Sequence, residues 1–299
     1  MTKTASIDFT VGSRRLLSVG RDLASWSFTL EDVLAGESAP LCPPRPGREG
    51  LRVLSAPSQA IPAITACFPH HLIGGQQDYR RHYIAMEGLS HEDYLARFSG
   101  KTRSTLRRKA RKLGEYAVTE HRTPAEIERF LDAALPLSAK TYQSRLLDAG
   151  LPADAAARKA MLEAAEDNRM RCFLLWVDGE AIAYLSLPVV GRTLVYEHLG
   201  YAPEWARMSP GTVLQLEALE RLFAEQRYAY FDFTEGEGAH KAMFGTDHAD
   251  CASFVLLDPT LANRALLGAR AGFDGAVSGA KALAERSGAL AKVRSALRG

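Results

Sequence analysis

Three apolar segments separated by short turns restrict the fold more than any other feature. Segments 171–177 and 181–187 flank Asp178-Gly179, a dipeptide typical of two-residue β-hairpin turns. A third apolar segment, 193–199, follows after a turn that contains a glycine. Consecutive strands joined by such short turns form an antiparallel meander, so the sequence excludes an all-helical fold.

A helix and a further strand are expected after the meander. Pro188 is expected to end the second strand, and Ser209-Pro210-Gly211 precedes the helix. The strand 228–233 follows this helix. A strand–helix–strand connection within one sheet makes its two strands parallel or nearly so. The apolar stripe of the helix is Val213, Leu216, Leu219, Leu222 and Phe223.

Helix-start signals occur at two further places. Ser90 precedes two acidic residues and is expected to cap a helix. Thr123 and Glu126 form a capping box with Pro124 at the first helical position. Another helix is expected over 153–167, and the alternation of helices with strands predicts an α/β fold.

Composition excludes several classes of protein. The 299 residues are 46% hydrophobic and 24% charged, with a net charge of +2, which is ordinary for a folded chain and argues against a chain-wide nucleic-acid surface. No run of about 18 apolar residues occurs, so we expect no transmembrane helix. The N-terminal residues lack the apolar core of a secretory signal, and a cytoplasmic location is expected.

Cysteine and histidine spacing gives no metal-site signature. The four cysteines form no CxxC pair, and the sequence contains no HExxH motif. Structural zinc sites and zinc hydrolases use such spacings. No metal is therefore expected, and the cysteines are interpreted as small buried hydrophobes in a reducing compartment.

Residues 101–112 carry seven basic residues and no acidic residue. Two interpretations stay open: a solvated helix face, or an electrostatic site for a phosphate-bearing ligand or an anionic surface. No aromatic residue interrupts the run, which argues against a platform for stacking nucleic-acid bases.

The Ser209-Pro210-Gly211-Thr212 segment is a candidate pyrophosphate site. The first turn of a helix leaves backbone N–H groups unpaired and carries the positive end of the helix dipole. Glycine would permit close approach of a phosphate, proline removes no needed donor, and Thr212 adds a hydroxyl. The alternative is an ordinary turn and helix cap.

The order of these elements, with two motifs, resembles a known superfamily. FSGKTRSTLRRKARKL (Phe98–Leu113) resembles the basic R-x-x-x-R-K-A-x-K helix of the Fem aminoacyl-transferases and of the BcsL/CelD-type acetyltransferases. That group also shows S-P-G before a helix and DF-x-x-G-x-x-x-YK-x-x-F/W-G after it. The second motif stands here as Asp232, Phe233, Gly236, Lys241, Phe244 and Gly245.

This chain departs from the group at two points. His240 replaces the usual tyrosine before the lysine, and Glu237-Gly238 replaces the usual Asp-Glu. The resemblance covers about residues 80–260 and implies a mixed, mostly antiparallel GNAT-like sheet flanked by helices. It also implies two GNAT-like halves: a degenerate one over 1–115 with the basic helix, and a catalytic acyl-CoA-binding one over 116–260, followed by a basic helical tail over 261–299.

The resemblance implies direct acyl transfer from a thioester to a primary amine, with acyl-CoA as co-substrate. Such chemistry needs a base, a proton donor for the leaving thiolate and a contact for the oxyanion. Glu197 is the candidate base because a carboxylate in an apolar strand lies either at an exposed edge or in a cleft. Strand alternation places His198 on the opposite face. Tyr201 is either the candidate proton donor or part of the wall of the site.

Two further residues follow the fourth strand of this region. Asp232 stands near the carboxyl end of that strand, where ligands bind in open sheets, or else it caps the glycine-rich loop after it. Lys241 is expected either to bind a phosphate of the co-substrate or to pair with Asp232. The expected cofactor-binding set is Ser209, Pro210, Gly211, Thr212 and Lys241.

The acceptor stays open among a lipid-like amine, an envelope or peptidoglycan precursor and a sugar amine. One alternative is a Fem-like transferase that uses aminoacyl-tRNA, which alone would bring a nucleic-acid partner. Another is a catalytically inactive GNAT-like binding module, favoured if Glu197 and Asp232 both lie on the outer surface.

The C-terminal segment 261–299 carries seven basic and two acidic residues. A basic amphipathic segment can lie on an anionic membrane surface, so peripheral contact with the inner membrane is one expectation. Helices packed on the core with a solvated basic face are the other. Glycines weaken any single long helix here: Gly268, Gly272, Gly275, Gly279 and Gly288.

Overall fold

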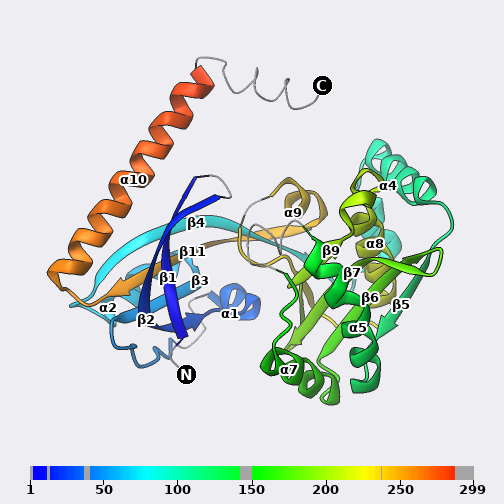
Figure 1. Ribbon diagram of the computed structural model, residues 1–299, viewed down its shortest axis with the longest axis horizontal. Coiled ribbons are helices and arrows are strands. Elements are labelled where there is room, and N and C mark those ends of the chain that lie inside the picture. The colour runs from blue at the N-terminus through cyan, green and yellow to red at the C-terminus, as the bar shows by residue number, and fades with distance from the viewer. Residues whose placement is uncertain (1–2, 12–13, 37–40, 142–149, 237, 287–299) are drawn as a thin grey trace. The chain divides into compact units, whose positions relative to one another are not determined.

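The first described elements are strands, and the last is a long helix (Figure 1). The computed structural model describes residues 3–11, 14–36, 41–141, 150–236 and 238–286. These residues divide into two units, one made of 1–79 with 250–299 and the other of 80–249. The boundaries 115/116 and 260/261 expected from the sequence do not coincide with these units, and the assignment of two GNAT-like halves stays a prediction.

In the first unit the strand order is β1-β2-β3-β11-β4. β2 runs antiparallel to β1 and parallel to β3, and β3 runs antiparallel to β11. The strands are β1 (Lys3–Val11), β2 (Arg14–Ser27), β3 (Gly50–Pro57), β4 (Leu72–Ala85) and β11 (Asp247–Leu257). The short helices are α1 (Leu30–Ala35), η2 (Ser58–Ala60) and α2 (Ile61–Ala66).

Within the described part of the C-terminal segment, one helix, α10 (Leu261–Arg286), is continuous through the glycines that are expected to weaken it. Each glycine costs up to about 1 kcal/mol relative to alanine. Leu266 and Leu267 offset part of this cost by packing against Ile7 and Leu257. A Cβ at Gly74 of β4 would lie 2.4 Å from a methyl carbon of Leu267. The glycine therefore leaves room for the Leu267 side chain.

In the second unit the strand order is β4-β10-β8-β7-β6-β5, with β9 paired to β7. All pairs are antiparallel except β8 with β10. This confirms the meander and the parallel strand–helix–strand connection. The strands are β5 (Ala117–His121), β6 (Met170–Val177), β7 (Glu180–Val190), β8 (Thr193–Val195), β9 (His198–Tyr201) and β10 (Tyr230–Asp232).

Local signals in this unit produce the expected turns and helix starts. Asp178 and Gly179 both have positive φ, 51° and 79°, as a two-residue hairpin turn of type I′ requires. Glu126 and Thr123 form the predicted capping box of α5. The helices are α3 (His91–Ala96), α4 (Gly100–Leu113), α5 (Pro124–Lys140), α7 (Ala155–Glu166), η3 (Pro203–Met208), α8 (Pro210–Ala224) and α9 (Ala239–Phe244).

Helices cover both faces of the second sheet (Figure 1). Side chains that alternate along the strands separate into two apolar clusters. Phe173 and Leu175 pack with α3, α4 and α8, whereas Cys172 and Leu174 pack with α5 and α7. The fold is therefore mixed α/β, with a mostly antiparallel sheet between helical layers.

The third strand of the meander is divided into β8 and β9, which the sequence does not predict. Leu194 of β8 pairs with Val189 of β7, and His198 of β9 pairs with Ser186 of β7. Between these two pairs the chain advances by four residues on the β8–β9 side and by three on β7. One extra residue therefore lies on the β8–β9 side, as in a β-bulge. Pro188 does not end β7, which continues to Val190.

Pro188 explains the position of this break. The Val189 N–H donates to the Arg169 carbonyl, 2.9 Å away on the β6 side. Neighbouring residues of a strand direct their N–H groups to opposite sides, so the Pro188 nitrogen faces β8 and β9. Proline has no N–H to donate there, and the ladder is interrupted at this point.

Candidate active site

The strand break places Tyr196-Glu197 between β8 and β9. The Tyr196 N–H still donates to the Asp232 carbonyl, at 2.8 Å, so the chain follows β10 up to this residue. From His198 onward it pairs with β7 instead. Within the described residues β9 has no strand partner on the side of β10, so its backbone groups on that side are free of ladder pairing.

Glu197, the candidate base, lies in this break and is not desolvated by burial. Its side chain is 51% exposed, and the His198 Nε2 lies 3.9 Å from its Oε2. The expectation that these two side chains point to opposite faces is therefore wrong. Strand alternation does not extend across residues 196 and 197, which are not in a strand. Tyr201, the candidate proton donor, is 36% exposed at the end of β9.

Helix α8 begins at Ser209, which adopts the left-handed conformation with φ 57° and ψ 47°. Pro210 occupies the first helical position. The N–H groups of Thr212 and Val213 both donate to the Ser209 carbonyl, at 3.0 and 3.3 Å. The first turn therefore keeps fewer unpaired N–H groups than the sequence argument assumes.

Gly211 is required by packing rather than by an open approach. A Cβ there would lie 2.7 Å from Leu199 Cδ2 and 3.3 Å from Tyr201 Cδ1. The residue is buried against β9, so packing by itself requires a glycine here, and the close approach of a phosphate stays a prediction. The absence of a side chain at Gly211 lets the start of α8 lie close to Tyr201.

The basic helix α4 supplies a cation at the same place. Lys109 Nζ lies 3.4 Å from the hydroxyl oxygen of Thr212, and Lys112 Nζ donates to the Arg207 carbonyl at 3.2 Å. All the other basic side chains of α4 are exposed: Lys101, Arg103, Arg107, Arg108 and Arg111. The basic run is thus part solvated face and part electrostatic contact with the start of α8.

A buried amide lies one turn further along α8. Gln215 is fully buried, and its Oε1 lies 2.7 Å from the His240 Nε2. The Gln215 Nε2 has no hydrogen-bond partner among the described residues. Burial lowers the pKa of His240, and Lys109 and Lys241 lower it further, so the imidazole is neutral at pH 7. We call Lys109, Thr212, Gln215 and His240 the helix-start cluster.

Asp232 is fully buried and ion-paired. Its carboxylate accepts from the Arg81 Nε at 3.1 Å and from the Arg81 Nη2 at 2.5 Å. The Thr234 N–H donates to the same carboxylate at 2.8 Å. Both carboxylate oxygens are thus engaged, which holds β10 and the loop after it in place. Of the two expectations, the geometry fits the carboxylate that fixes the loop.

Lys241 reaches the same loop. Its Nζ donates to the carbonyl of Glu235. Burial is the main cause that lowers the pKa of Lys241, and Asp232 opposes this effect. The side chain therefore ties α9 to the segment after β10, and Asp232 acts on it electrostatically.

An apolar hollow of about 170 Å³ adjoins the helix start, between α3, α4 and α8. Its walls include Leu95, Leu106 and Leu216, and its rim carries charged side chains such as Arg107 and Glu217. Helix α4 therefore contributes apolar wall as well as positive charge to this side of α8.

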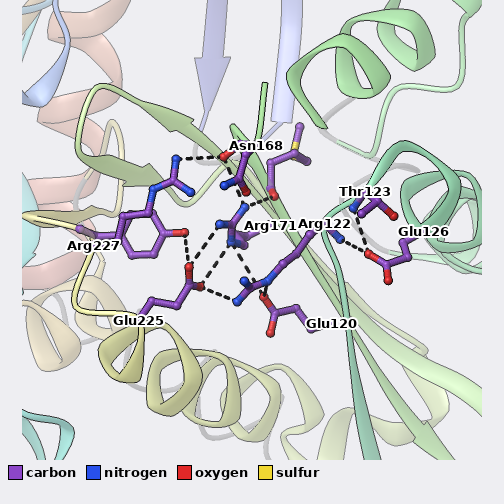
Figure 2. Close-up of polar contacts among 10 residues, drawn as sticks. Glu120, Arg122, Thr123, Glu126, Asn168, Arg171, Glu225 and Arg227 are labelled. Atoms are coloured by element: carbon purple, nitrogen blue, oxygen red, sulfur yellow. Dashed lines mark hydrogen bonds and ion pairs between the residues drawn. The ribbon is translucent and has the colours of Figure 1, made fainter. Parts of the chain in front are cut away.

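The other end of α8 carries a saturated ionic network (Figure 2). The Arg171 side chain, 1% exposed, donates to Glu225 at 3.2 and 3.3 Å and to the Met170 carbonyl at 2.8 Å. Arg122 Nη2 lies 2.9 Å from Glu225, and the Tyr228 hydroxyl donates to Glu225 at 3.1 Å. The Arg171 network comprises Glu120, Arg122, Arg171, Glu225 and Tyr228.

Sequence reasoning missed Arg81, Lys109 as an individual contact, and Gln215. Arg81 is 151 positions from its partner Asp232, and no local pattern links the two. Gln215 did carry a signal, because an amide stands between apolar residues of a buried helix face. Within the described residues, no cluster of histidine, cysteine and carboxylate side chains suitable for a metal is present.

Residues 100–242 match the family model described as "Acetyltransferase (GNAT) domain". No curated protein matches the chain significantly. Among solved structures, FemX is 12% identical over 70% of this chain and 72% of its own, with a TM-score of 0.50. The C-terminal domain of a putative lysylphosphatidylglycerol synthetase from Agrobacterium fabrum is 12% identical over 75% and 72%, with a TM-score of 0.49.

A tandem GNAT protein from the clavulanic acid biosynthesis pathway is 16% identical over 72% of this chain and 66% of its own, with a TM-score of 0.43. At 12% identity, the similarity to FemX speaks for the fold alone. The family match covers α4 to α9 and so includes the strand break and the helix-start cluster. The fold is therefore GNAT-like, and residues 100–242 carry the pattern of an acetyltransferase (GNAT) domain, which indicates a transferase.

Proposed function

We propose that this protein transfers an acyl group from a coenzyme A thioester directly to a primary amine. The observation that carries the proposal is the start of α8, where Lys109 meets Thr212 beside the strand break. This arrangement lies inside the segment that matches the acetyltransferase domain. A phosphate there would meet an ammonium group, a hydroxyl and the positive end of a helix dipole.

Each residue at the start of α8 has a separate proposed role toward the pyrophosphate of acyl-CoA. Thr212 offers its hydroxyl and Lys109 its ammonium, whereas Ser209 and Pro210 shape the turn. Gly211 allows the turn to approach β9. Lys241, held at the loop after β10, adds positive charge from α9.

Two exposed groups near the break are assigned to proton transfer. Glu197 accepts the proton of the attacking ammonium, and its exposure leaves it accessible to an acceptor from solvent. Tyr201 donates a proton to the leaving thiolate. Asp232 is assigned a positioning role, because Arg81 and the Thr234 N–H occupy its oxygens.

The finer membership, in the Fem-like BcsL/CelD-type group, is part of the proposal and rests on the motif from Asp232 to Gly245. The apolar hollow beside α8 favours an acceptor, or an acyl group, with an apolar part. A lipid-like amine is therefore proposed ahead of a sugar amine or a peptidoglycan precursor.

The Fem-like alternative, with aminoacyl-tRNA as donor, draws support from the exposed cations of α4. It predicts that tRNA binds and competes with acyl-CoA, with an affinity that falls steeply with salt. The inactive-module alternative would be favoured by finding both candidate carboxylates on the outer surface. Asp232 is fully buried, so that condition is not met.

Calorimetric titration with CoA, together with thiol release from acyl-CoA and an amine, tests the proposal. Lys109→Met should weaken CoA binding about tenfold, the size of one charge-assisted hydrogen bond. Lys101→Met removes the same charge from an exposed position of α4 and should change affinity less than twofold. A wild-type protein that binds no CoA and releases no thiol would overturn the proposal.

Gly211→Glu adds a negative charge to the start of α8 and should also abolish CoA binding. Because its side chain would displace Leu199, Gly211→Ala is the matched control for the packing effect alone. Unchanged CoA affinity in a folded Gly211→Glu protein would remove the start of α8 from the binding site.

A further inference from the structure

Gln215 is a fully buried side chain with one hydrogen-bonding group left over. Its Oε1 is engaged by His240 at 2.7 Å, and its Nε2 has no partner among the described residues. A buried, unpaired donor costs free energy, and buried polar groups in folded proteins are nearly always paired. The exception therefore calls for a partner that the chain itself does not supply.

His240 fixes the orientation of this amide. Aromatic rings hold the imidazole on α9, with ring centroids 4.7 Å from Phe244 and 6.4 Å from Phe233. Burial keeps the imidazole neutral, with its pKa below the ordinary value. In the tautomer that carries the proton on Nε2, His240 donates to the Gln215 Oε1, which leaves the two N–H bonds of the amide nitrogen for a ligand.

The positive charges near the amide favour an oxygen atom as the ligand of the Gln215 Nε2. Lys109 and Lys241 both act on His240, so positive charge borders the amide from α4 and from α9. A positive potential favours a ligand atom that carries or develops negative charge. The reverse orientation of the amide would present its carbonyl oxygen beside two cations and would suit a donor ligand instead.

Contacts with β9 locate Gln215 beside the proposed reaction centre. The Tyr196 ring, which precedes Glu197, lies 6.5 Å from the His240 ring. Gly211, one helical turn before Gln215 on the same face of α8, contacts Leu199 and Tyr201. Gln215 therefore lies on the face of α8 that packs toward the segment with the proposed base and proton donor, and its partner His240 lies beside Tyr196.

We propose that Gln215 Nε2 donates a hydrogen bond to the carbonyl oxygen of the transferred acyl group, with His240 as its positioning residue. This inference rests on the proposed acyl transfer. The amine, having lost a proton to Glu197, forms the C–N bond as the carbonyl π pair moves to oxygen. That negative oxygen meets the Gln215 amide. When the C=O bond re-forms, the C–S bond breaks, its electron pair goes to sulfur, and the sulfur takes a proton from Tyr201. The nitrogen of the new amide then gives its remaining extra proton to the Tyr201 phenolate, which restores the phenol and leaves a neutral amide.

Gln215→Met tests the assignment because it removes the donor at nearly constant volume. Loss of one oxyanion donor lowers kcat about 10²–10³-fold, whereas CoA affinity should stay within about threefold because the contact strengthens only in the transition state. Gln226→Met is the matched control, since Gln226 lies just after α8 and its amide donates to the Phe223 carbonyl. Its kcat should equal that of the wild type.

The split between kinetic constants distinguishes two possible carbonyl partners. A higher KM and weaker CoA binding with unchanged kcat would mean that Gln215 holds an amide carbonyl of the pantetheine arm, and the oxyanion role would be overturned. Unchanged kcat and KM would make the amide purely structural. A wild type that neither binds CoA nor releases thiol overturns the proposed function and this assignment together.

His240 is tested by rescue. His240→Leu removes the donor to Gln215 Oε1 and should lower kcat about as much as Gln215→Met. His240→Asn keeps a donor and should recover most of the loss, and the double change His240→Leu/Gln215→Met should be no slower than Gln215→Met alone. Additive losses in the double variant would show that His240 does not act through Gln215.

Discussion

The two ends of α8 differ in how completely their polar groups are paired. At the C-terminal end, Glu225 receives hydrogen bonds from Arg171, Arg122 and Tyr228 (Figure 2). At the N-terminal end, Ser209 starts the helix in a left-handed conformation without a side-chain cap among the described residues. Gln215 follows there with an unpaired amide.

Under the proposed function, this difference separates the residues that hold the unit together from those that would contact a substrate. A fully paired buried network contributes rigidity and is costly to break. Unpaired donors and left-handed residues cost stability and concentrate at functional sites. The same helix therefore serves both purposes, and changes at its two ends should have opposite signatures in activity and in stability.

Glu197→Gln should show the largest effect, and only in activity. Loss of a general base lowers the rate by about 10²–10⁴-fold. The side chain is half exposed, so the free energy of unfolding should change by less than about 0.5 kcal/mol. Thiol-release kinetics and urea unfolding measure the two quantities. Turnover within threefold of the wild type would remove Glu197 from the mechanism.

Arg171→Met should show the reverse signature. It leaves the Glu225 carboxylate without its main buried partner, and breaking such a pair costs about 3–5 kcal/mol. Turnover per folded molecule should stay near the wild-type value. Urea unfolding with activity measured below the transition tests both. Arg169→Met, which removes an exposed ion pair with Asp167, is the control and should cost less than about 1 kcal/mol.

One histidine near each end of α8 should contribute to the pH dependence of the free energy of unfolding. Burial lowers the pKa of His240 near the helix start and of His121, which lies between Glu120 and Arg122. A base with a lowered folded-state pKa binds protons more weakly in the folded than in the unfolded chain. The free energy of unfolding therefore falls as pH drops below the ordinary histidine value of 6.5.

Urea unfolding at about pH 7 and about pH 5 measures this loss. His240→Asn and His121→Asn should each make it smaller, because each removes one group that resists protonation. An equal loss in the wild type and in both variants would show that these histidines keep ordinary proton affinities when folded.

The C-terminal residues should have the smallest effect, on membrane association alone. Residues 287–299, which lie outside the described structure, contain Lys292, Arg294 and Arg298 and no acidic residue. Each basic residue near an anionic bilayer contributes roughly 1 kcal/mol, which salt screens. Within the described residues, no helix has the length and apolarity needed to span a membrane.

A chain that ends at Arg286 tests this contact. A cut at Pro259 would be less specific, because it would uncover Leu257, against which α10 packs. The full chain should sediment with anionic vesicles at low salt more than the shortened chain does, and neither should sediment with neutral vesicles. Equal sedimentation of both chains in every condition would leave the tail without a membrane role.

Local signals account for much of what the sequence predicted correctly. The Asp178-Gly179 hairpin and the Thr123 capping box each depend on residues within four positions of one another. The parallel pairing of β8 with β10 follows from a chain rule for strand–helix–strand units. These features are set by local backbone preferences, so one sequence suffices to identify them.

The features that were missed depend on partners distant in the chain. The break at Tyr196-Glu197 arises because β8 and β9 pair with different parts of β7, and Pro188 alone suggested only a strand end. Gln215 could be noticed as polar, but its partner His240 is 25 positions away. Asp232 and its ion-pair partner Arg81 are 151 positions apart in the chain, and no periodic pattern of the sequence links residues at that distance.

Pro188 sets the stability of the sheet against the turnover proposed for this site. A residue such as valine there would restore an N–H facing β8 and β9 and favour an unbroken ladder. Such a protein should be more resistant to urea, yet Glu197 would return to strand alternation and lose its place in the break. A selection for thermal stability alone would thus tend to replace this proline, whereas a selection for turnover would keep it.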